Sequence, residues 1–157
     1  MKFKVAEDIG APIDMVFAHM TDFTSFEADA KGRGAELRRV DNWTRASAGV
    51  EWRGAVQVRG KTRAIAARVT TLTPQDTVVV DSRVGGMDCQ LEMTFVELSS
   101  TMTRVGMILE LRPDTLTARL ILQTLKLARG RVLQRMTGVL ARQGDAIEAA
   151  LRRQQRG

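Results

Sequence analysis

The chain has 157 residues and a formal net charge of +6, with 44% apolar and 27% charged residues. This length suits one domain, and the composition is near the average for folded globular proteins, which excludes a disordered or fibrous chain. No apolar run approaches the ~20 residues that a membrane-spanning helix needs, and the N-terminus does not resemble a secretory signal. We therefore expect one cytoplasmic domain over residues 1–157.

The residues that most often carry catalysis are scarce. Cys89 is the only cysteine, His19 is the only histidine, and tyrosine is absent. These counts exclude an internal disulfide, a Cys/His zinc site and a Ser-His-Asp triad. The sequence contains no phosphate-binding loop, dinucleotide fingerprint or metal-ligand cluster. We therefore expect no metal and no cofactor, and enzymatic activity is not the favoured function.

The positive charge is concentrated in the last quarter of the chain. From residue 114 to the C-terminus, nine Lys or Arg residues stand against three Asp or Glu residues, so this segment carries the whole net charge. Nucleic-acid sites combine such charges with aromatic side chains on which bases stack. The chain has neither tyrosine nor a run of aromatic residues, so nucleic acid is the least favoured partner.

The first thirty residues predict a strand and two short helices. Residues 2–9 alternate between apolar and charged side chains, as a half-buried strand does. Pro12 then stands at a favourable first helical position before apolar residues at helical spacing. A second short helix is expected over 22–29, with Phe23 and Phe26 facing the core.

Alternation of apolar and polar residues continues through the middle of the chain. Glycine-rich or Thr-Pro-rich turns separate the alternating runs, which indicates a meander of hairpins. An antiparallel sheet with one polar face needs a cover on its other face. The predicted strands cover approximately residues 35–41, 48–59, 62–72, 77–84, 88–98 and 102–112.

The cover is expected to be a long C-terminal helix over about 114–154. Its apolar residues share one broad arc, and most of its basic residues lie on the opposite side, facing water. A straight helix of ~40 residues would be ~60 Å long, nearly twice the ~35 Å of an 11-residue strand. The helix must therefore overhang or bend, and Gly130, Gly138 and Gly144 are the candidate bend positions.

This order of elements resembles the helix-grip fold of the START-like, or SRPBCC, superfamily. The sequence is similar to the polyketide cyclase/dehydrase and coenzyme Q-binding branch in three segments, IGAPIDMVFAHMTDF, GVEWRGAVQVRG and LELRPDTLTARLILQTL. The resemblance implies an α+β fold in which a curved seven-stranded antiparallel sheet grips the long helix. It also implies an elongated apolar cavity between the two. Phe26 departs from the tryptophan that relatives often carry near the pocket entrance.

The inward positions of the predicted strands and helix are the candidate lining of that cavity. Arg129 lies inside the apolar arc of the helix, so it is a charged candidate among apolar ones. Ser82, Cys89, Arg129 and the indole of Trp52 are the candidate polar groups. The predicted lining consists of Trp52, Val56, Ile65, Val69, Cys89, Leu91, Met93, Phe95, Val105, Met107, Leu109, Leu125, Ala128, Arg129, Val132 and Met136.

A cavity with few polar groups favours binding or transport of a hydrophobic small molecule, such as a lipid, an isoprenoid or a polyketide-like compound. The basic helix, together with Leu120 and Leu127 on its polar side, indicates an anionic membrane surface as a partner. Two alternatives stay open. One is a polyketide cyclase or dehydratase in which Arg129 stabilises an oxyanion. The other is an interaction module that forms a homodimer through Leu116, Leu120 and Leu127.

Overall fold

The computed structural model describes residues 1–58 and 60–157. The predicted order of one strand, two helices, six strands and a C-terminal helical segment is confirmed. The elements are β1 (Lys2–Ile9), α1 (Ile13–Met20), α2 (Phe23–Gly32), β2 (Glu36–Arg39), β3 (Glu51–Val58), β4 (Lys61–Thr73), β5 (Thr77–Val84), β6 (Met87–Ser99), β7 (Met102–Pro113), α3 (Leu116–Leu127) and α4 (Arg129–Arg156).

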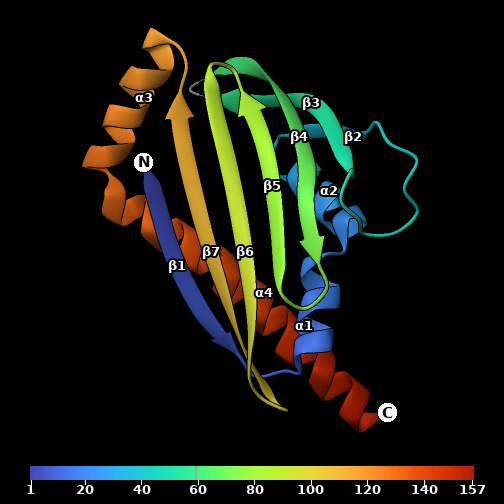
Figure 1. Cartoon of the computed structure of the whole chain (residues 1–157). Helices are drawn as coiled ribbons and strands as arrows, with labels where there is room; N and C mark the ends of the chain where they lie inside the picture. The colour runs from blue at the N-terminus through green and yellow to red at the C-terminus, as the bar shows by residue number, and fades with distance from the viewer. Residues whose placement is uncertain (59) are drawn as a thin grey trace.

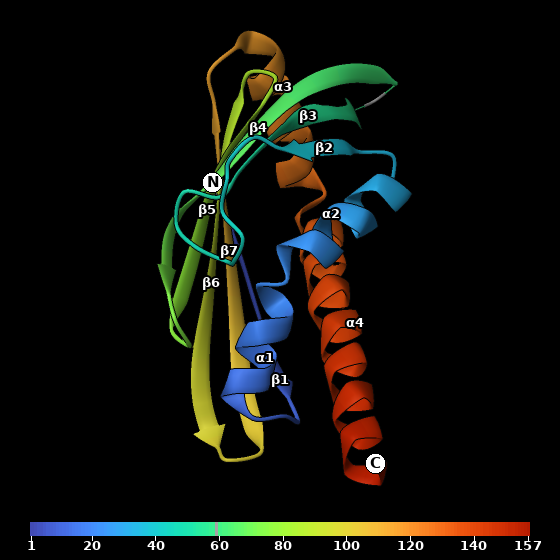
Figure 2. The ribbon, with the colours of Figure 1, turned by 90° about the vertical axis from the view of Figure 1, so that its right-hand side faces the viewer.

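The seven strands form one antiparallel sheet in the order β1-β7-β6-β5-β4-β3-β2. Figure 1 shows α4 running behind this sheet, and Figure 2 shows that α1, α2 and α4 lie on the same side of it. We call the covered side the inner face. The chain therefore has the predicted α+β architecture, with β1 and β2 as the two edge strands.

The strand that was predicted over 48–59 begins later than expected, at Glu51. Gly49 has φ +98°, a left-handed conformation that an extended strand does not contain, so pairing starts only after this residue. The last predicted position, residue 59, lies outside the described residues. The short strand expected over 35–41 is confined to Glu36–Arg39.

The best-packed part of the core lies where α4 crosses β1. Ile9 is 1% exposed, and Leu140 and Ile147 of α4 are fully buried. Gly144 lets the helix approach closely, because a Cβ at this position would lie 3.2 Å from Cγ1 of Ile9. This contact fixes α4 against the edge of the sheet.

The expected continuous helix over about 114–154 is instead two helices. Ala128 separates α3 from α4 with φ −102° and ψ 25°, outside helical geometry. None of the three candidate glycines is the break residue, although Gly130 follows it by two positions. Figure 1 shows α3 beside the upper end of β7, while α4 continues behind the sheet. Among the described residues, no helix is long and apolar enough to cross a membrane.

The prediction that both phenylalanines of the second helix face the core is wrong for Phe26. Phe23 is 8% exposed, whereas Phe26 is 58% exposed. The covered side of α2 carries Phe23, Glu27 and Ala30, which are spaced four and three residues apart. Phe26 lies at the margin of this side and is left exposed.

Candidate functional site

Burial on the inner face of the sheet changes along the strands. At the end covered by α1, Phe17 packs edge-on against Phe95 with ring centroids 4.9 Å apart, and Val105 and Met107 are buried. Further along the same strands several inward side chains are only half-buried, before Leu111 and Met87, nearer α3, are buried again. We call these half-buried side chains the inner patch. Its members are Leu109, Leu91 and Val80, which form one row across three strands, and Cys89, Ser82 and Ala67 in the next row.

The two C-terminal helices carry a matching set of half-buried apolar side chains. These side chains pack against the core but keep part of their surface exposed. They are Ile121, Leu122 and Leu125 of α3 and Val132 and Leu133 of α4. An apolar ligand between the sheet and the helices would cover the apolar surface that both leave exposed.

The sixteen predicted lining residues fall into three groups. Seven are buried in the core, namely Trp52, Val69, Met93, Phe95, Val105, Met107 and Met136. Eight are half-buried, namely Val56, Ile65, Cys89, Leu91, Leu109, Leu125, Ala128 and Val132. Arg129 is exposed. The register brings Cys89, Leu91 and Leu109 together in the inner patch.

Arg129 lies at one end of the inner patch. Its guanidinium carbon is 5.3 Å from the ring centroid of Phe3, and Phe3 pairs with Leu109 across the β1–β7 ladder. A cation over an aromatic face is attracted by the ring, and the exposed side chain keeps its contact with water. This geometry explains how the apolar arc of the helical segment accommodates a charged residue.

The thiol of Cys89 and the hydroxyl of Ser82 come from residues that pair across β5 and β6. Burial raises the pKa of the Cys89 thiol above its ordinary value, and the Ser82 hydroxyl acts in the opposite direction. The protonated thiol is a poor nucleophile and a poor metal ligand. No group of three or more His, Cys, Asp or Glu side chains suited to a metal ion occurs among residues 1–58 and 60–157.

A polar cluster where α2 meets β2 and β3 was missed from the sequence. The indole N–H of Trp52 donates to Oε1 of Glu27 at 2.7 Å, so this donor is already used inside the protein. Arg39 lies 3.4 Å from the same carboxylate oxygen and donates two 2.9 Å hydrogen bonds to Asp41. Arg39 and Asp41 are two residues apart, but Glu27 lies 12 residues from Arg39 and 25 from Trp52, so no sequence signal pointed to the cluster.

Asp41 anchors the loop between β2 and β3. The Arg39 guanidinium and the backbone N–H groups of Glu51 and Trp43 hold the pKa of its carboxyl well below the usual range. The side chain is 8% exposed and accepts hydrogen bonds from all three partners. We therefore assign Asp41 a structural role.

Two hollows flank α2. One, of about 740 Å³, lies between α2 and the β2–β3 edge, and its lining includes Glu27, Leu37 and Gly54. The other, of about 790 Å³, lies between the end of α2 and α4, and arginines dominate its lining. The predicted lining residues do not contribute to either hollow.

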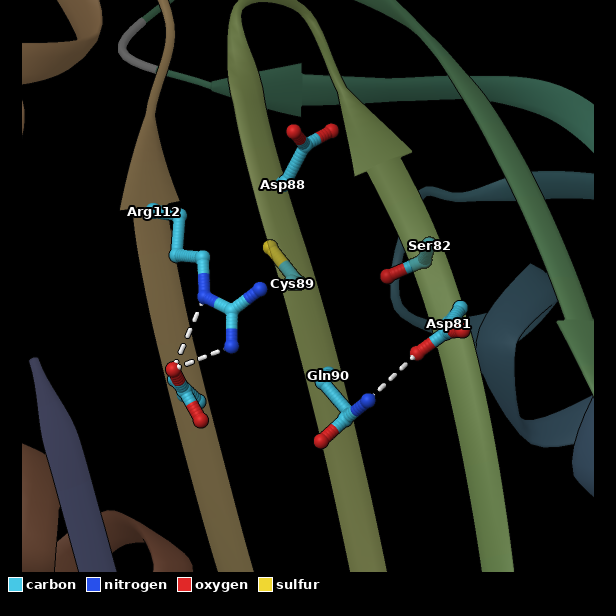
Figure 3. A pocket seen from close by; sticks show the side chains of 7 residues that line it. Asp81, Ser82, Asp88, Cys89, Gln90 and Arg112 are labelled. Atoms are coloured by element: carbon cyan, nitrogen blue, oxygen red, sulfur yellow. Dashed lines mark hydrogen bonds and ion pairs between the residues drawn. The ribbon is translucent and has the colours of Figure 1, made fainter. Parts of the chain in front are cut away.

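A third, smaller hollow of about 290 Å³ involves β5, β6 and β7 and includes Cys89. Figure 3 shows that polar side chains dominate it and pair with one another. Arg112 contacts Glu110 at 2.7 Å, and Gln90 donates to Asp81 at 3.0 Å. These four residues alternate with the inner-patch residues, so they belong to the outer face of the sheet.

Comparison with solved structures establishes the fold. A protein from Thermus thermophilus superposes with TM-score 0.70 at 17% identity, covering 96% of this chain and 99% of the other. An aromatase/cyclase from a Streptomyces species gives TM-score 0.71 at 14% identity, covering 96% and 95%. A START superfamily protein from Mycobacterium smegmatis gives TM-score 0.57 at 11% identity, covering 88% and 98%. No protein-family model and no curated protein matches the sequence. The chain has the helix-grip fold of the START-like, or SRPBCC, superfamily.

Proposed function

We propose that this protein binds a hydrophobic small molecule between the inner face of its sheet and helices α3 and α4. The observation that carries the proposal is the half-burial of apolar side chains on both sides, above all the row of Leu109, Leu91 and Val80. Each Å² of apolar surface removed from water contributes roughly 25 cal/mol. A lipid, an isoprenoid or a polyketide-like molecule of matching length would supply that cover.

The hollow between α2 and the β2–β3 edge is the proposed entrance. Gly54 in its wall pairs with Ile65, and Ile65 lies on the inner face two residues from Ala67 of the inner patch. The wall of the hollow at Gly54 is therefore separated from the inner patch by Ile65 of the neighbouring strand. Its volume of about 740 Å³ falls within the usual range for small-molecule sites.

A fluorescence titration with N-phenyl-1-naphthylamine, an uncharged apolar probe, tests this site. We expect saturable binding to the wild type, and the variant Leu91→Trp should weaken it at least ten-fold because the indole fills the patch. The matched control is Ile108→Trp, a half-buried position on the outer face of the neighbouring strand. Absence of saturable binding, or an equal loss in the control, would contradict the proposal.

We also propose that α3 docks on an anionic membrane, at the cytoplasmic side, to load or release the ligand. Leu116, Leu120 and Leu127 are 74%, 57% and 93% exposed and lie on one side of the helix. Arg119 and Lys126 flank them, and α3 has no acidic residue. Exposed leucines beside basic residues suit the interface of an acidic bilayer.

Co-sedimentation with vesicles tests this docking. Binding should require phosphatidylglycerol in a phosphatidylcholine bilayer, should weaken as salt rises, and should fall several-fold in Leu127→Ser. Equal binding to neutral vesicles would contradict it. The dimer alternative predicts instead that, without any lipid and at high protein concentration, Leu127→Ser has a lower sedimentation coefficient than the wild type.

A cyclase or dehydratase activity is the second candidate, and the position of Arg129 favours it. The guanidinium stands over Phe3, which pairs with Leu109 at the end of the inner patch, so it could polarise a carbonyl of a molecule bound there. The structural likeness to an aromatase/cyclase agrees with this candidate. It predicts conversion of a poly-β-keto thioester that is lost in Arg129→Ala, with the fold retained. Unchanged conversion would remove Arg129 from the reaction.

A further inference from the structure

Four arginines line the hollow between the end of α2 and α4. Arg33 comes from the C-terminal end of α2, and Arg131, Arg135 and Arg142 come from α4. Figure 2 shows α2 and α4 on the same side of the sheet. We call this hollow, of about 790 Å³, the arginine groove.

The α4 arginines form a line. Their spacings of four and seven residues place them on one side of the helix over 11 residues, a length of about 16 Å. Gly138 lies between them, and a Cβ there would stand 3.4 Å from Nη1 of Arg142. The missing side chain gives the Arg142 guanidinium room to lie along the helix.

The arginines of the groove make no ion pair within 4.0 Å in the described part of the protein. The ion pairs found there engage other basic side chains, such as Arg39, Arg83 and Arg104. The lining of the groove contains no Asp or Glu. Arg131 and Arg135 stand one turn apart, where like charges repel. A bound anion would remove this repulsion.

We propose that the arginine groove binds the phosphate group of an anionic ligand. A planar guanidinium donates two parallel hydrogen bonds to phosphate oxygens, and several guanidiniums in a row suit a group with more than one negative charge. Two sources share this chemistry. The phosphate belongs either to a separate soluble molecule or to the head of an amphipathic ligand whose apolar part reaches the inner patch. Only the second source rests on the proposed function.

Isothermal titration calorimetry of the whole chain with inorganic pyrophosphate tests the groove. We expect Arg131→Gln and Arg135→Gln each to raise Kd roughly ten-fold, the loss typical of one charge-assisted hydrogen-bonded contact. The affinity should also fall as salt rises. The matched control is Arg152→Gln, an exposed arginine of α4 outside the groove, which should leave Kd unchanged. No binding, or the same loss in the control, would overturn the proposal.

Farnesyl diphosphate distinguishes the two sources, because it carries the same diphosphate on an apolar chain. Tighter binding than pyrophosphate, weakened by both Arg135→Gln and Leu91→Trp, supports the amphipathic ligand. Equal binding of the two probes supports a separate soluble anion. Pyrophosphate binding should be unchanged in Leu91→Trp, so failure of the apolar site and failure of the arginine groove give different results.

Discussion

The indole N–H of Trp52 donates a 2.7 Å hydrogen bond to Oε1 of Glu27, and this bond joins β3 to α2. Phe23, at the start of the same helix, packs edge-on against the indole with ring centroids 5.3 Å apart. Together these contacts hold α2 between the two larger hollows. The position of α2 therefore determines the width of both the proposed entrance and the arginine groove.

Removal of the Glu27 carboxylate should loosen this attachment. Trp52 is 3% exposed, so Glu27→Ala leaves a buried N–H donor without its acceptor and should lower the free energy of unfolding by about 1–3 kcal/mol. Glu27→Gln keeps an acceptor oxygen and should cost less than the alanine variant. Urea denaturation at pH 7 measures both. Equal losses in the two variants would show that the hydrogen bond is not the stabilising contact.

The stability of the protein should depend on pH through Asp41. Its pKa is lowered in the folded state, chiefly by Arg39, so the folded protein binds fewer protons than the unfolded chain when pH falls below about 4. The stabilisation is complete above the ordinary carboxyl pKa and is lost as pH falls towards the lower folded value. We expect Asp41→Asn to be less stable at pH 7 and to lose less further stability upon acidification.

The pH dependence of stability that remains in Asp41→Asn serves as the control for this experiment. Asp8, Asp22 and Glu110 also have pKa values below their ordinary ones, so the asparagine variant should retain part of the acid dependence. Urea denaturation between pH 3 and pH 7 gives both profiles. A variant profile parallel to that of the wild type would show that Asp41 does not contribute to the slope.

Replacement by alanine should have opposite effects on stability at two glycines. A Cβ on Gly54 would overlap the carbonyl oxygen of Glu36, so Gly54→Ala must separate β2 from β3 and should cost about 1–3 kcal/mol or more. A Cβ on Gly130 would meet nothing within 4 Å, and alanine favours a helix over glycine by up to about 1 kcal/mol. Gly130→Ala should therefore be neutral to stabilising. Thermal unfolding of both variants measures the contrast.

The strands could be predicted because an antiparallel meander is built from local hairpins, and alternation marks every strand. The break at Ala128 could not, because alanine favours helix and nearby glycines offered more plausible bends. The candidate site, too, could be predicted from the sequence only in part. Alternation identified Leu91 and Leu109 as inward residues, but their partial burial depends on how far the helices cover them. Arg33 and the α4 arginines line the same hollow only because the fold brings the end of α2 near α4, which no sequence spacing records.

Cys89 should report on the inner patch by its reactivity. Burial raises the pKa of its thiol and half-covers the sulfur, so its reaction with a disulfide reagent at pH 8 should be at least several-fold slower than that of the urea-unfolded chain. Saturating N-phenyl-1-naphthylamine should slow the reaction further, because the register places Cys89 beside Leu91 and opposite Ser82. Pyrophosphate should not slow it, since Cys89 does not line the arginine groove. A reaction rate unaffected by the apolar probe would mean that the probe binds elsewhere. The inner patch would then not be the ligand site, even if the fluorescence titration is saturable.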